Sequence, residues 1–247
     1  MEKQNLEQHL SELKKRIVIS TLFFVVSFCF TYFYAIEIYQ FLMQPLINSF
    51  DNLNNRRMIY TSPGEGFMTY MKVSFYSSLF FSIPFFLIQI YLFLSPALYK
   101  NEKKIVFMIF FFVPLLFFLG AIFAYYFLLP LTFKFFLSFE FQGFSDGNQI
   151  PVQLETKISE YLNLICEIIF SFGIAFQLPI LLIFLIRCGF ISVNDLQNKR
   201  KYWIVAIFII AAILTPPDVV SQVSLAIPMI FLFEISILIG KKIKTKL

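Results

Sequence analysis

The stretch LTPPDVVSQ, residues 214–222, places two prolines, an aspartate and a glutamine between two apolar runs. Polar side chains are costly in hydrocarbon unless they find a partner or water. Asp218 is suited to cap the N-terminus of a following helix, where its charge meets the positive end of the helix dipole. Gln222 lies four residues later on the same helix face, and capping does not account for it. The stretch is therefore either a tight turn at a membrane surface or a polar site.

Two glutamates stand beside clusters of basic residues. Glu12, in EQHLSELKKRI, is followed by two lysines and Arg16, and Glu102, in SPALYKNEKK, lies among lysines. A solvated ion pair explains each glutamate, and for Glu12 the partner would be Arg16 at i,i+4 spacing. Alternatively, two carboxylates at one membrane surface can clamp a cationic partner, because guanidinium groups bind carboxylates bidentately.

Gln177, in SFGIAFQLP, is a third polar position within an apolar run. It either forms a structural hydrogen bond, to another helix or to the carbonyl freed by Pro179, or makes a functional polar contact. Enzymatic chemistry has little support, because His9 is the only histidine, the three cysteines form no CxxC pair and no phosphate-binding loop motif occurs. We expect no catalytic residue, metal or cofactor.

The composition indicates an integral membrane protein. The chain has 247 residues, of which 59% are hydrophobic and 14% charged, and its mean hydropathy is +0.77. Soluble domains carry about 25% charged residues. The first apolar run, 17–36, is longer than the apolar core of a secretory signal peptide and no cleavage motif follows it, so we interpret it as a retained span.

The elements that must position these residues are membrane-spanning helices. Most of the 20 Lys and Arg residues fall on alternate connections and on both termini, which predicts that both termini face the cytoplasm and that the number of crossings is even. We expect a single membrane domain, 1–247, with a cytoplasmic amphipathic segment at 1–16. Its six spans would lie at about 17–36, 73–99, 105–133, 162–186, 200–215 and 218–239. Four spans plus a re-entrant hairpin are the alternative, because the last two apolar runs are short.

Prolines within these spans predict the shape of the bundle. Pro84, Pro114, Pro179 and Pro228 each remove a helical hydrogen bond and bend their helix. The expected fold is therefore all-α, with six helices in a concave, kinked bundle. The two long connections assigned to the outside, 37–72 and 134–167, are polar and are expected to form structured caps.

Together these motifs resemble the TatC family, the multispanning receptor subunit of the Sec-independent twin-arginine protein translocase. The resemblance runs from about residue 7 to 239, and its segments are HLSELKKRI, SPALYKNEKK, SFGIAFQLP, NKRKYWIV and LTPPDVVSQVSLAIPMIFLFEISI. The last segment is the most specific. The six-span topology with both termini inside is also the topology of that family.

The resemblance implies roles for particular residues. It places a signal-peptide site at Glu12, Lys14, Leu98, Tyr99 and Glu102. It places contacts for translocation or for partner subunits at Pro45, Phe67, Gln177, Asp218 and Gln222. Two positions depart from the family pattern: Lys14 stands where arginine is frequent, which removes the fork geometry, and Gln177 stands where an ionisable glutamate is frequent.

The resemblance also implies a function. The chain would bind Arg-Arg signal peptides of folded cargo and organise the single-span subunits TatA and TatB for export driven by the proton-motive force. It would associate with itself and with the lipid bilayer but not with nucleic acid, although its net charge is +5. Its location would be the cell inner membrane, or the mitochondrial inner membrane if it is organelle-encoded. The alternatives are a small-molecule secondary transporter, which would be expected to show inverted repeats, and a membrane-embedded hydrolase, which would need clustered polar residues in the spans.

Overall fold

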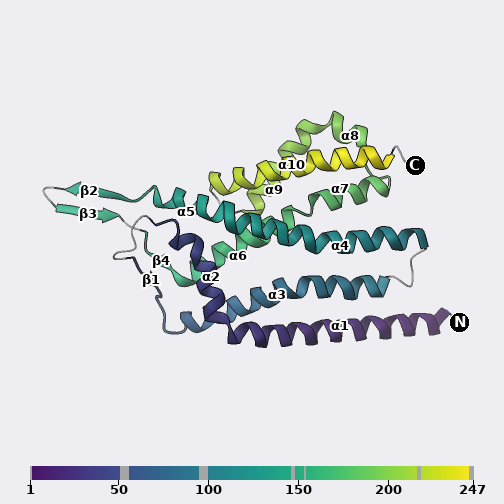
Figure 1. Cartoon of the computed structure of the whole chain (residues 1–247), viewed down its shortest axis with the longest axis horizontal. Coiled ribbons are helices and arrows are strands. Elements are labelled where there is room, and N and C mark those ends of the chain that lie inside the picture. The colour runs from purple at the N-terminus through teal and green to yellow at the C-terminus, as the bar shows by residue number, and fades with distance from the viewer. Residues whose placement is uncertain are drawn as a thin grey trace. The chain divides into compact units, whose positions relative to one another are not determined.

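The computed structural model describes residues 2–50, 56–94, 100–145, 148–152, 154–215 and 218–244, which are mainly helical (Figure 1). They form two compact units, Met1–Phe41 with Pro63–Leu115 and Leu42–Ser62 with Leu116–Leu247. Each unit is described by itself below.

Five helical stretches within the described ranges are long and apolar enough to cross a membrane, namely Leu10–Phe33, Glu65–Phe93, Val106–Leu137, Ile158–Arg187 and Val219–Lys242. This confirms the predicted class, a helical integral membrane protein. Helix α9 (Arg200–Leu214) has 15 residues, and at about 1.5 Å per residue it is too short to cross a bilayer of about 30 Å unaided. The count of six spans and their orientation stay predictions.

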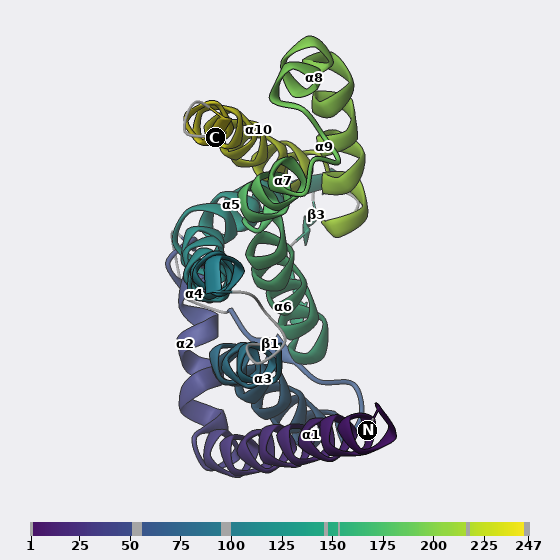
Figure 2. The same cartoon turned by 90° about the vertical axis from the view of Figure 1, so that its right-hand side faces the viewer.

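The first unit is built on two long helices, α1 (Glu2–Phe33) and α3 (Glu65–Leu94), which lie side by side (Figures 1 and 2). The hydroxyl of Thr31 on α1 donates to the Ser74 carbonyl of α3 at 2.9 Å, and the rings of Phe23 and Phe85 stack with centroids 4.0 Å apart. Residues 2–16 of the segment predicted to be amphipathic are helical and continuous with the first apolar run, because no proline or glycine interrupts residues 2–33.

This unit also contains parts of two further helices. They are the first half of α2 (Ala35–Ile47) and the first two-thirds of α4 (Lys100–Phe123). After Phe123, α4 continues through a π-helical turn, η2 (Ala124–Leu128), into α5 (Leu129–Leu137), and these elements belong to the second unit.

The second unit also contains α6 (Ile158–Ala175), α7 (Leu178–Arg187), α8 (Val193–Asn198), α9 and α10 (Val219–Lys244). Helix α10 packs against both α7 and α9. Fully buried apolar side chains from these helices form the core, among them Leu162, Ile165, Phe172, Leu225, Met229 and Phe233. Proline positions divide into two kinds: Pro179 opens α7, whereas Pro84, Pro114 and Pro228 lie inside helices.

The part of the chain that the structure describes also contains four short strands, which the all-α expectation did not include. Strands β2 (Phe141–Ser145) and β3 (Asn148–Val152) form an antiparallel hairpin in which Phe141 pairs with Val152. Strands β1 (Met58–Ile59) and β4 (Thr156–Lys157) pair in parallel, Met58 with Thr156 and Ile59 with Lys157. The two polar connections predicted to be structured caps therefore pair with each other through backbone hydrogen bonds.

Candidate functional site

The carboxylate of Glu12 lies near the N-terminal end of α1 and forms the ion pair that the sequence predicts. Its Oε1 accepts a hydrogen bond from Nη2 of Arg16 at 3.1 Å. The other terminal nitrogen of Arg16, Nη1, donates to Oε1 of Gln89 on α3, also at 3.1 Å. Gln89 is buried, whereas the Glu12 side chain keeps 34% of its surface exposed. Sequence reasoning missed Gln89, although a single amide within FFLIQIYLFL was a signal for it.

Two hollows of the first unit meet at Arg16. One has a volume of about 480 Å³ and a mixed polar lining of Ser11, Glu12, Lys15, Arg16 and Ile19. The other is a groove of about 530 Å³ between α1 and α3, and it is lined mainly by apolar side chains such as Ile17, Phe24 and Phe86. A cationic group can therefore reach Glu12 from the polar hollow.

The other residues predicted for a peptide site lie at the same end of this unit or outside the described residues. Lys14 is exposed on α1. Glu102 lies in the first turn of α4, and its side chain is outside the described part of the chain, as are Leu98 and Tyr99 entirely. Figure 1 shows the N-terminal ends of α1 and α4 and the C-terminal end of α3 at one end of the unit. The backbone thus brings the two glutamate-bearing segments to a common end.

Asp218 immediately precedes α10 and caps it. Its Oδ2 accepts a hydrogen bond from the Ser221 N–H at 2.7 Å, which confirms the capping prediction. Its Oδ1 is buried and accepts no hydrogen bond within the described ranges. Nε2 of Gln222 donates to the Phe208 carbonyl of α9 at 3.3 Å, so the glutamine joins α10 to the short helix α9.

Further hydroxyl groups join this turn to neighbouring helices of the second unit. The Oγ atoms of Thr132 on α5 and Ser221 on α10 lie 3.4 Å apart. The Ser171 hydroxyl of α6 donates to the Leu214 carbonyl at the end of α9. The end of α9 is therefore held by a contact from α6, and the start of α10 by a contact from α5 and by the Asp218 cap.

The remaining predicted residues have separate settings. Nε2 of Gln177 donates to the Gly173 carbonyl at 3.2 Å, a structural hydrogen bond within its own helix end. Pro45 is buried inside α2, where its carbonyl accepts from the Ser49 hydroxyl at 2.6 Å. Phe67 lies in the first turn of α3 and is 57% exposed. Pro45 and Phe67 belong to different units.

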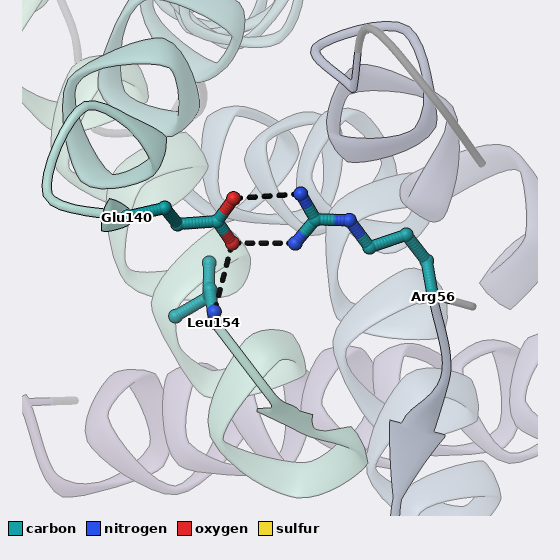
Figure 3. A network of polar contacts seen from close by, with 3 residues as sticks. All are labelled: Arg56, Glu140 and Leu154. Atoms are coloured by element: carbon teal, nitrogen blue, oxygen red, sulfur yellow. Dashed lines mark hydrogen bonds and ion pairs between the residues drawn. The ribbon is translucent and has the colours of Figure 1, made fainter. Parts of the chain in front are cut away.

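A second ionic network, which sequence reasoning also missed, joins the two polar connections (Figure 3). The guanidinium of Arg56 donates to both oxygens of Glu140, at 2.5 and 2.6 Å, and the Leu154 N–H donates to Glu140 Oε1 at 2.8 Å. These hydrogen bonds, chiefly those from Arg56, hold the pKa of Glu140 below its ordinary value. Arg56 also lies over the ring of Phe50, 4.7 Å from its centroid.

A comparison with protein families identifies the family of this chain. The family described as "Sec-independent protein translocase protein (TatC)" matches residues 8–228. Nothing among the described residues gathers three His, Cys, Asp or Glu side chains in a metal-binding group.

Curated proteins and solved structures give the same likeness. The chain is 43% identical to the TatC protein of Rickettsia prowazekii, over 99% of this chain and 96% of that one. It is 36% identical to the TatC protein of Escherichia coli K12, over 96% of this chain and 88% of that one. A crystal structure of the twin arginine translocase receptor TatC in DDM superposes with a TM-score of 0.72 at 34% identity, covering 94% of this chain and 99% of the other.

Proposed function

The chain belongs to the TatC family and is a core subunit of the Sec-independent protein translocase, and from this premise we propose that it is the receptor for Arg-Arg signal peptides of folded cargo. Its role lies in protein transport, and it is a multi-pass membrane protein. The observation that carries the proposal is the position of Glu12, a partly exposed carboxylate on the wall of a polar hollow.

The chemistry of recognition follows from the charges. A guanidinium binds a carboxylate through two parallel hydrogen bonds, and two adjacent arginines require two carboxylates. Glu12 supplies one, and Glu102 is proposed to supply the other from the first turn of α4. Lys14, which follows Glu12 by two positions, is proposed to adjust the charge of the site. Leu98 and Tyr99 are proposed to contact the peptide next to Glu102.

Export also requires partner subunits, and α9 offers a surface for them. Val205, Ile209 and Ile213 recur every four residues, so they lie on one face of this short helix, and they are 58%, 56% and 76% exposed. We propose that single-span TatA- or TatB-type subunits pack on this stripe, with Asp218 and Gln222 as polar contacts near its end. Pro45, Phe67 and Gln177 are proposed to contact cargo or partner subunits during export. Export is proposed to take place across the inner membrane of a bacterial cell and to be driven by the proton-motive force.

The test of the proposed receptor function is binding of a signal peptide by the full chain in lipid nanodiscs. An Arg-Arg peptide should crosslink in higher yield than its Lys-Lys counterpart, because only a guanidinium can form the fork contact with a carboxylate. Glu102→Gln should weaken Arg-Arg binding by about 1.5–3 kcal/mol, the scale of a hydrogen bond to a charged group. Equal yields for both peptides would reject the receptor role, whereas equal yields for wild type and Glu102→Lys would reject only the role of Glu102.

A further inference from the structure

Arg16 places a guanidinium of the chain itself on the carboxylate proposed to receive the arginine of a signal peptide. We propose that Arg16 is a built-in competitor: it pairs with Glu12 between cargoes, gives up Glu12 but keeps its hydrogen bond to Gln89 when a peptide arginine arrives, and returns to Glu12 when the peptide leaves. This inference rests on the proposed receptor function and extends it to two residues, Arg16 and Gln89.

The geometry shows a guanidinium shared between two acceptors through two long hydrogen bonds. Arg16 makes one hydrogen bond to Glu12 and one to Gln89, each 3.1 Å long. Charge-assisted hydrogen bonds are usually about 2.7–2.9 Å, and a fork contact would use both oxygens of one carboxylate. Oε2 of Glu12 accepts no hydrogen bond from any described residue. The ion pair of Arg16 with Glu12 is thus incomplete.

Gln89 gives Arg16 a second position that does not depend on Glu12. The amide is buried on α3, at the wall of the apolar groove that Arg16 also lines. If the contact with Glu12 is broken, the guanidinium still has its hydrogen bond to Gln89. A guanidinium at an apolar wall without any hydrogen bond would be high in free energy. Displacement of Arg16 from Glu12 is therefore inexpensive, and Arg16 remains close enough to return.

The competition acts on arginine more than on lysine. A peptide guanidinium needs both Glu12 oxygens for a fork contact and must displace Arg16. A lysine ammonium needs one oxygen, and Oε2 is open to it. Arg16 therefore lowers the affinity of the site for arginine, which favours release of the signal peptide once cargo has been delivered.

Three substitutions in the full chain test this inference, with fluorescence anisotropy of a labelled Arg-Arg signal peptide and of its Lys-Lys counterpart. Arg16→Gln should tighten Arg-Arg binding by about threefold, because an exposed ion pair of this kind is worth a factor of a few. The Lys-Lys peptide should bind Arg16→Gln more tightly than wild type only by the amount that loss of one positive charge explains. Gln89→Leu, which suits the apolar groove, should weaken Arg-Arg binding by about twofold, since Arg16 can then give both nitrogens to Glu12.

Lys15→Gln is the matched control, because Lys15 lines the same polar hollow and its removal deletes the same charge without breaking the ion pair. If Lys15→Gln tightens Arg-Arg binding as much as Arg16→Gln, the effect is net charge and the competitor inference is wrong. Weaker Arg-Arg binding by Arg16→Gln would likewise overturn it. Absence of Arg-Arg binding in wild type would reject the receptor function itself, whereas wild-type binding that Glu12→Gln leaves unchanged would reject only the competitor.

Discussion

At the residue scale, the two carboxylate oxygens of Asp218 have different surroundings. Oδ2 caps α10 through the Ser221 N–H, and Oδ1 is buried without a hydrogen bond from the described residues. Asparagine can cap as well as aspartate but carries no charge. Substitution therefore separates capping from any role of the charge.

We expect Asp218→Asn to leave the level of membrane-inserted protein unchanged. Asp218→Ala should cost about 1 kcal/mol of stability and lower that level, because the cap is lost. The measurement is quantitative blotting of membranes beside export of a folded reporter with an Arg-Arg signal. A normal level of the Ala variant would contradict the cap, and reduced export by Asp218→Asn at a normal level would show that the charge contributes to export.

Gln222 tests whether the same turn is a contact site. Gln222→Leu removes one long hydrogen bond, 3.3 Å, to the Phe208 carbonyl, a loss of about 0.5–1 kcal/mol that leucine packing offsets. We expect a normal protein level and reduced export, because a partner helix loses a polar contact that hydrocarbon cannot replace. Full export by this variant would mean that Gln222 only joins α9 to α10.

At the scale of elements, α4 and α6 approach closely at two glycines. A Cβ atom on Gly120 would lie 2.5 Å from the Phe172 carbonyl oxygen, and one on Gly173 would lie 2.4 Å from the Phe117 ring. Backbone cannot yield as a side chain can, so the contact at Gly120 is the stricter one. Small residues at helix contacts are a common way for membrane helices to pack closely.

Gly120→Ala should therefore destabilise the protein by about 1–3 kcal/mol, the usual cost of an overpacked contact. Gly173→Ala should cost less, because the Phe117 ring can move. Gly66→Ala is the control, since nothing lies within 4 Å of its added Cβ. Thermal unfolding in detergent gives the order of stabilities, and Gly120→Ala at least as stable as Gly66→Ala would contradict the close contact.

At the scale of the whole molecule, the network of Arg56, Glu140 and Leu154 stabilises the paired polar connections. The side chains of Arg56 and Glu140 keep only 23% and 19% of their surface exposed, so their hydrogen bonds are partly shielded from water. Arg57 and Glu155 also pair, at 3.2 Å, but with 74% and 52% exposed. Exposed pairs contribute little.

We expect Arg56→Gln to lower the free energy of unfolding by about 1–2 kcal/mol at neutral pH. Because the pKa of Glu140 is lowered in the folded state, this stabilisation is present above its ordinary value of 4.5 and is lost as the pH falls below it. Thermal unfolding of wild type and variant across pH 3–8 measures the difference. Arg57→Gln should be neutral, and a difference between wild type and Arg56→Gln that does not shrink in acid would contradict the network.

Topology is a further prediction for the whole chain. In a variant with Cys29, Cys166 and Cys188 replaced by serine, Glu155→Cys should react with an impermeant thiol reagent from outside. Asn198→Cys should react only after the membrane is opened, because the basic residues around it favour the cytoplasm. The reverse pattern would exclude the orientation with both termini inside.

Those features of the structure that depend on residues close together in the chain could be predicted from the sequence alone. Apolar runs of sufficient length specify membrane helices, because in hydrocarbon the backbone N–H and C=O groups must hydrogen-bond to one another. The Asp218 cap and the pair of Glu12 with Arg16 were predictable because their partners lie three and four residues away on one helix. The strands escaped prediction because they have only two to five residues, and because β1 and β4 each depend on a partner far away in the chain.

Only the tertiary structure decided which side chains meet across elements. Arg16 and Gln89 are 73 positions apart in sequence, and Arg56 and Glu140 are 84 apart. Helical periodicity fixes the face on which a residue lies, but not the rotation or axial offset of a neighbouring helix. Those depend on the summed packing of many side chains, including the close contact at Gly120. The sequence alone therefore specified a carboxylate at Glu12, and packing of α1 against α3 decided that its guanidinium partner is shared with Gln89.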